Sequence, residues 1–303
     1  MSRSAAIAAA APRAGFLRRR TRSYRLLTVP ALVVVGAVIV FPWLFTLYMS
    51  AFDWKIGEAA HFVGLSNYTG LATNQRFIEA IVHTFYFTLL AVIFPLLLGT
   101  AAALIFHREF RGRGFLRAIF TLPMMATPVA VALVWTMMFH PQQGVLNYLL
   151  SLVGLPPSLW VYSPTWVIPS LVIVEVWHWT PLVMLIVLGG LAALPTEPFE
   201  SARIDGAGEW QLFTYVTLPL IAPFLMMAAV IRTIDAVKAF DTIYVISQGG
   251  PGTASETVNL YLYLQAFAFY NIGNASAVVV IFFTIVLALA LVLLYLRQRT
   301  TWT

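Results

Sequence analysis

Six apolar runs, each long enough to cross a lipid bilayer, constrain this chain more than any other feature of its sequence. A bilayer core requires about 20 apolar residues in a helix, and a helix satisfies its own backbone hydrogen bonds in lipid. Only 10% of the 303 residues are charged, whereas a soluble domain carries about 25%. We therefore predict an all-α polytopic membrane protein with six transmembrane helices. They lie at roughly 26–49, 84–106, 117–139, 166–191, 219–240 and 276–296.

The arginines and lysines predict the orientation of these helices. Segment 1–25 holds seven arginines, and the loop after the second run holds Arg108, Arg111, Arg113 and Arg117. Loops 140–165 and 241–275 hold no arginine or lysine. Because cytoplasmic loops carry the excess of basic residues, we place both termini and the loop 196–218 in the cytoplasm.

The basic N-terminal segment followed by an apolar run resembles a signal peptide. The run is longer than a signal peptide requires, and no small-residue cleavage site follows it, so we expect an uncleaved anchor. The predicted organisation is a disordered cytoplasmic segment at 1–25, a six-helix membrane domain at 26–297 and a short cytoplasmic tail at 298–303.

Several motifs of catalysis and nucleotide binding are absent from the sequence. It has no G-x-x-x-x-G-K-[ST], H-E-x-x-H, G-x-S-x-G or G-x-G-x-x-G pattern, and it has no cysteine. Glu175 and His178 form half of a di-iron carboxylate motif, but the other half is missing. We therefore expect His178 to be a hydrogen-bonded residue of the helix bundle, and we expect no metal site, no bound cofactor and no catalytic residue in this chain.

The predicted cytoplasmic loop 196–218 differs from the other cytoplasmic segments because it is acidic. It carries four acidic residues against the single Arg203. Thr196 and Pro198 are suited to the start of a helix, whereas Gly206 and Gly208 interrupt it. We therefore predict a helix, a glycine hinge and a second helix. An acidic rim with aromatic residues favours a docking surface for another protein over a loop that lies on anionic lipid.

The stretch "ESARIDGAGEWQLFTYVTLPL" (200–220) closely resembles the EAA loop of permease subunits of binding-protein-dependent ABC importers. A serine replaces the first alanine of the family pattern, which is a change between two small residues. The segments "FVGLSNYTG", "FHPQQGVLNYLL" and "FDTIYVISQGGPGTASETVNLYLYLQAF" look like the carbohydrate-import branch. The residues that match the coupling motif are Glu200, Ser201, Ala202, Asp205, Gly206, Ala207 and Phe213, followed by Leu218 and Pro219.

This resemblance covers about residues 26–300 and implies a function. The chain would be the pore subunit of an importer in the inner, cytoplasmic membrane of a prokaryote. It would carry a sugar or polyol that an extracytoplasmic binding protein delivers. The partners implied are a homologous second permease and two ATPase subunits, which would bind ATP and Mg and receive the loop 196–218 as a coupling helix. The chain itself would be a transporter subunit and not an enzyme.

Charged residues within the predicted spans need a separate explanation, because each costs about 2.5–3.5 kcal/mol at a helix centre. Arg232, Asp235, Lys238 and Asp241 follow one another at intervals of three, which predicts one slanted stripe on the fifth helix. Counting the helical rise places Glu175 and Arg232 at similar depths. We therefore expect them to pair or to face one cavity.

Two interpretations of these charges remain open. They form either a structural ladder between the fourth and fifth helices or part of the substrate path, for which the candidates are Glu175, Trp179, Arg232, Asp235 and Lys238. Trp177, Trp179, Phe240 and Tyr244 are candidates for stacking on sugar rings. The alternative function is a secondary transporter driven by an ion gradient, with Glu175, His178 and Asp235 as a proton relay.

Overall fold

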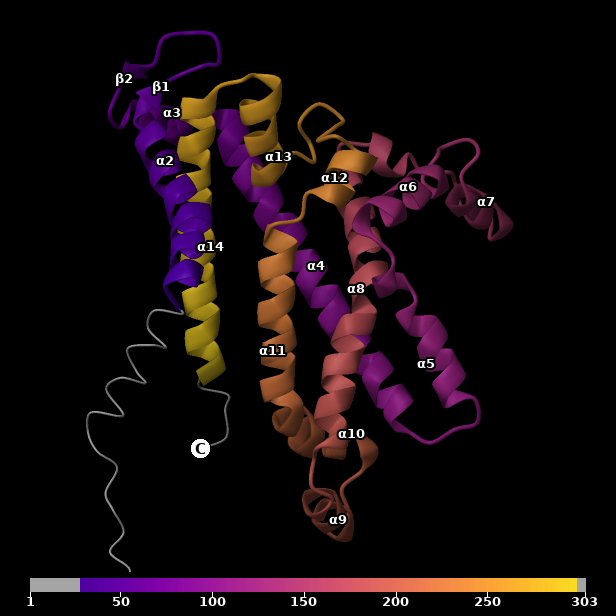
Figure 1. Ribbon diagram of the computed structural model, residues 1–303. Helices are drawn as coiled ribbons and strands as arrows, with labels where there is room; N and C mark the ends of the chain where they lie inside the picture. Colours follow the sequence, from indigo (N-terminus) through magenta and orange to yellow (C-terminus); the bar gives the residue numbers. More distant parts are fainter. Residues whose placement is uncertain (1–27, 299–303) are drawn as a thin grey trace, which may run out of the picture.

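The computed structural model describes residues 28–298, and this part of the chain is mostly helical (Figure 1). Five of its helices are long and apolar enough to cross a membrane. The five are Thr28–Met49, α4 (Gln75–His107), α8 (Val167–Ala192), Glu209–Val237 and α14 (Ile272–Gln298). The helix Thr28–Met49 ends with the π-helical η1 (Gly36–Val40) and α2 (Phe41–Met49). The helix Glu209–Val237 consists of α10 (Glu209–Gln211), η4 (Leu212–Thr217) and α11 (Leu218–Val237).

The prediction of a continuous third helix over 117–139 is wrong. The chain forms α5 (Arg113–Thr121), the short 3-10 turn η2 (Pro123–Met125) and α6 (Pro128–Met138). The cause is local, because a proline lacks a backbone N–H and disfavours helical backbone in the residue before it. Thr127, which precedes Pro128, is extended with φ −71° and ψ 144°. Whether this broken segment completes a sixth crossing stays a prediction.

Short elements cover the two ends of the bundle (Figure 1). The helix α9 (Glu197–Ile204) forms one end together with α10. The first long helix begins on this side of the molecule, and α14 ends on it. Segments 1–27 and 299–303 lie outside the described residues. The opposite end is formed by β1 (Phe52–Asp53), β2 (His61–Phe62), α3 (Ser66–Thr73), α7 (Val145–Leu152), η3 (Trp160–Tyr162), α12 (Asp241–Ile246), α13 (Val258–Tyr263) and η5 (Leu264–Ala268).

A salt bridge fastens the end formed by α13 to the start of α4. Arg76 Nη2 lies 2.8 Å from Glu256 Oε2, and the Glu256 side chain is only 3% exposed. The Arg76 guanidinium also lies 5.8 Å from the ring centroids of both Tyr261 and Phe269. Burial raises the pKa of the Tyr261 phenol. The loop before α13 is therefore held against α4 by residues 180 positions apart.

The helices α4 and α8 form the centre of the bundle and pack closely at Gly99. A Cβ atom added at Gly99 would lie 2.7 Å from the Cβ of Val183 and 3.0 Å from the backbone nitrogen of Met184. Both distances are too short for carbon in van der Waals contact. Small residues let membrane helices approach in this way, so Gly99 sets the separation of α4 and α8.

We expect Gly99→Ala to lower the free energy of unfolding by about 1–3 kcal/mol, because the added methyl group forces α4 away from α8. The measurement is the thermal unfolding midpoint of the purified chain in detergent. The matched control is Gly189→Ala in α8, where the added Cβ has no atom within 4 Å apart from its chain neighbours and the nearby backbone of its own helix. Equal midpoints for the two variants would contradict this account of the packing.

Candidate functional site

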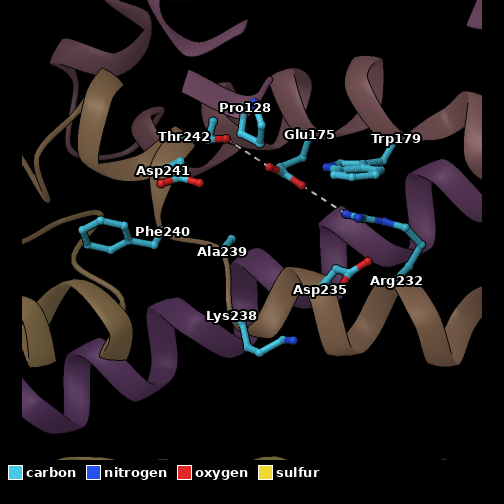
Figure 2. Close-up of a pocket in the computed structure, with 10 residues that line it drawn as sticks. All are labelled: Pro128, Glu175, Trp179, Arg232, Asp235, Lys238, Ala239, Phe240, Asp241 and Thr242. Carbon is cyan, nitrogen blue, oxygen red and sulfur yellow. Dashed lines mark hydrogen bonds and ion pairs between the residues drawn. The ribbon is translucent and has the colours of Figure 1, made fainter. Parts of the chain in front are cut away.

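A polar cavity of about 300 Å³ lies where α8, α11 and α12 meet (Figure 2). Its lining combines acidic, basic and aromatic side chains. The helix α8 contributes residues from one side, and Pro128 begins the neighbouring α6. The others come from α11, α12 and the link between them. The side chains used below are Glu175, Trp179, Arg232, Asp235, Lys238, Phe240, Asp241 and Thr242.

A buried ion pair forms one wall of the cavity. Arg232 Nη2 lies 3.1 Å from Glu175 Oε2, and the two side chains are 0% and 6% exposed. Thr242 donates a hydrogen bond from Oγ1 to Glu175 Oε1 at 3.3 Å. Figure 2 shows these contacts running from Thr242 through Glu175 to Arg232. The pairing expected from the matched depths of Glu175 and Arg232 is therefore present.

Further contacts stabilise the Arg232 guanidinium only in part. Its carbon Cζ lies 4.9 Å from the ring centroid of Trp179, which provides a cation–π contact. Its Nη2 also donates to the carbonyl oxygen of Ala91 on α4 at 3.5 Å. The Nε and Nη1 atoms are buried and have no hydrogen-bond partner among the described residues. Because the Arg232 guanidinium is buried and has unused donors, removing Glu175 would leave an uncompensated charge and destabilise the fold.

The other three charged residues of the cavity are exposed to it and take part in no ion pair of the described chain. They are Asp235, Lys238 and Asp241. The prediction that they continue one helical stripe is wrong beyond Asp235, because α11 ends at Val237 and Asp241 begins α12. The break nevertheless leaves all three around the same cavity (Figure 2).

The structure separates the aromatic and histidine candidates of α8. Trp179 lines the cavity, whereas Trp177 lies edge-on to Trp135 of α6, with ring centroids 5.8 Å apart. His178 is buried, and its Nε2 lies 3.2 Å from the carbonyl oxygen of Ala126. It is thus a hydrogen-bonded bundle residue, as expected. Sequence reasoning missed Thr242, which no motif marks.

The second candidate site is the loop between α8 and α11, which protrudes at one end of the molecule (Figure 1). The predicted helix, glycine hinge and helix are present as α9, Gly206 and α10. Gly206 has a φ of +84°, a left-handed conformation that favours glycine. The Gln211 side chain accepts a hydrogen bond from the backbone N–H of Gly208 at 2.9 Å. The loop therefore has a defined shape.

Large apolar side chains on this loop face outward. Ile204, Trp210 and Tyr215 are 86%, 74% and 78% exposed. Leu212 is buried and anchors the loop, whereas Phe213 is half-buried. The other predicted coupling residues divide into an exposed group, Glu200, Ser201, Asp205 and Gly206, and a half-buried group, Ala202 and Ala207.

The chain is similar to proteins of known type along most of its length. Residues 95–301 match the family described as "Binding-protein-dependent transport system inner membrane component". The trehalose/maltose transport system permease protein MalF of Thermococcus litoralis is 36% identical, over 78% of this chain and 80% of the relative. The sulfoquinovosyl glycerol transport system permease protein SmoG of Agrobacterium fabrum is 33% identical, over 78% and 77% of the two chains.

A solved structure shares the fold at lower sequence identity. It is a chain in the crystal structure of a bacterial alginate ABC transporter in complex with an alginate pentasaccharide-bound periplasmic protein. The TM-score is 0.82 at 22% identity, with 96% of this chain and 99% of that chain covered. The arrangement of helices described above is therefore the fold of an ABC transporter permease.

We expect Arg232→Met to lower the free energy of unfolding by about 3–5 kcal/mol, because it leaves Glu175 charged and buried without its partner. The double variant Glu175→Gln/Arg232→Met removes both charges and should recover a large part of that loss. The measurement is thermal unfolding of the purified chain in detergent, analysed as a double-mutant cycle. The control Asp241→Asn, at an exposed and unpaired residue, should change stability by less than about 0.5 kcal/mol. Strictly additive effects of the two substitutions would contradict the coupling.

Proposed function

This chain belongs to the family of binding-protein-dependent transport system inner membrane components, and on this premise we propose how it serves as the permease subunit of an ABC sugar importer. It forms half of the translocation pore in the inner membrane of a prokaryote. A homologous second permease completes the pore, an extracytoplasmic binding protein delivers the sugar, and two partner ATPase subunits bind ATP and Mg. We set aside the alternative of an ion-driven carrier, because the relatives of this chain are ABC permeases.

The proposal is carried chiefly by the exposed apolar side chains of the protruding loop. Ile204, Trp210 and Tyr215 are too large and too exposed to be explained by packing within this chain. The three lie on one loop, and exposed apolar surface of this kind marks interaction sites. The loop is acidic and protrudes beyond the long helices (Figure 1), which favours a protein partner over lipid. We assign it to the ATPase subunit.

The cavity supports a neutral sugar or polyol as the substrate. Its five charged side chains comprise three carboxylates and two cations, which leaves one net negative charge. Glu175 and Arg232 neutralise each other, so Asp235, Lys238 and Asp241 remain free to bind hydroxyl groups. A carboxylate accepts hydrogen bonds and an ammonium group donates them, whereas a hydroxyl group can do both. An anionic sugar would be repelled by the excess of carboxylates.

A single purification tests the proposed partners. The tagged chain is extracted from native membranes in mild detergent, and a second permease and an ATPase subunit should copurify with it. We expect Ile204→Asp to lose the ATPase subunit but retain the second permease, because a charge on this surface would have to be buried in the interface. The matched control is Ile56→Asp, at a residue that is 57% exposed near the opposite end. Retention of the ATPase subunit by Ile204→Asp would contradict the assignment of the docking surface.

We expect Gly206→Val to reduce sugar uptake at least about tenfold, because a β-branched residue is strained at a positive φ and will distort the coupling loop. The measurement is ATP hydrolysis and uptake of trehalose by the reconstituted importer in the presence of its binding protein. The control Gly208→Ala, at a φ of −74°, should behave like the wild type. Normal uptake by Gly206→Val would argue against a coupling role that depends on the shape of this loop.

A further inference from the structure

Four aromatic rings extend from the polar cavity, three of them in mutual contact and the fourth beyond them. Phe240 lines the cavity, and its ring is stacked on that of Tyr244 with centroids 5.2 Å apart and an interplanar angle of 14°. Tyr263 of α13 lies 5.2 Å from Phe240 and 5.1 Å from Tyr244. Phe267, one turn further along, lies 5.2 Å from Tyr263. We call these four residues the aromatic row.

The aromatic row leads away from the coupling loop. Its members come from α12, from the residue before it, and from α13 and η5. Figure 1 places α12 and α13 at the end of the molecule opposite α9. The row therefore connects the cavity, through Phe240, with the end of the permease at which the proposed orientation places the binding protein.

The rings are partly open instead of being wholly absorbed into the core. Phe240 and Tyr263 are partly buried and pack against a buried apolar cluster. Tyr244 is 36% exposed and Phe267 is 66% exposed. The hydroxyl groups of Tyr244 and Tyr263 lie 3.5 Å apart, so polar groups border the rings. A purely structural core would have buried these rings, and a purely apolar interface would not carry two neighbouring hydroxyl groups.

This combination of ring faces and hydroxyl groups matches the chemistry of a pyranose. One face of a pyranose presents C–H groups, and an aromatic face carries the negative part of the ring quadrupole that attracts them. The edge of the sugar carries hydroxyl groups, which tyrosine hydroxyls can bind.

We propose that the aromatic row is a carbohydrate-binding track that receives a pyranose sugar from the outer side and passes it to the charged cavity. The proposal rests on the proposed function as a sugar importer. It adds Tyr263 and Phe267, which lie outside the cavity, to the residues that contact the substrate. The track binds the neutral, C–H-rich faces of the sugar, and the cavity binds its hydroxyl groups.

The test uses the assembled importer reconstituted with its binding protein, with trehalose and maltotriose as probes. In Phe267→Leu the side chain stays apolar but loses its flat face. Its KM for uptake should rise about 2- to 12-fold with unchanged maximal rate, and Phe267→Tyr should restore the wild-type KM. The control Tyr148→Leu, at a residue of α7 that is 64% exposed and outside the row, should have no effect.

A labelling experiment provides a second readout that does not depend on transport. The chain has no cysteine, so Phe267→Cys creates a single thiol whose modification by a maleimide is read from the mass of this chain. Either probe sugar should slow the modification of Phe267→Cys but not that of Tyr148→Cys. Since stacking is common to pyranoses, lack of protection by both sugars would overturn the proposal.

Two further outcomes separate the track from the rest of the account. If Phe267→Leu loses the second permease on purification, the row is a subunit interface and the proposal is wrong. If wild-type importer transports sugar while Phe267→Leu keeps a normal KM, the track fails but the proposed function stands. If the wild-type chain copurifies with no ATPase subunit, the proposed function itself fails.

Discussion

The ion pair between Arg232 and Glu175 organises the centre of this molecule. A fully buried guanidinium in an apolar bundle requires a counter-charge, and Glu175 on α8 provides it at 3.1 Å. Thr242 at the start of α12 and the carbonyl of Ala91 on α4 complete the contacts. Four helices thus meet at one pair of charges.

The position of the pair also explains why a polar cavity exists in an otherwise apolar bundle. Because Arg232 and Glu175 neutralise each other's charge, Asp235, Lys238 and Asp241 are left to face the cavity. The long helix Glu209–Val237 carries Arg232 and Asp235 near one end and Trp210 at the other. In the proposed importer, a movement of the coupling loop would therefore reach the cavity through one continuous helix. The aromatic row extends the same path toward the opposite end.

The sequence predicted most of the fold because lipid restricts the choices of the backbone. The first, second, fourth, fifth and sixth apolar runs each correspond to a long helix. The loop with Gly206 was predictable because a glycine hinge between two helical patterns is a local signal. The third run was mispredicted because hydrophobicity alone does not register Pro123 and Pro128, which divide that run into α5, η2 and α6.

The sequence by itself determined the membrane environment, the type of each long helix, the family resemblance of residues 200–220 and the matching depths of Glu175 and Arg232. These depend on composition, local pattern and helical rise, which need no knowledge of neighbours. Only the tertiary structure decided that Thr242 joins the ion pair, that Trp179 and not Trp177 faces the cavity, and that Phe267 continues a row begun by Phe240. These depend on how helices are rotated and packed against one another, which long-range contacts set and no local pattern encodes.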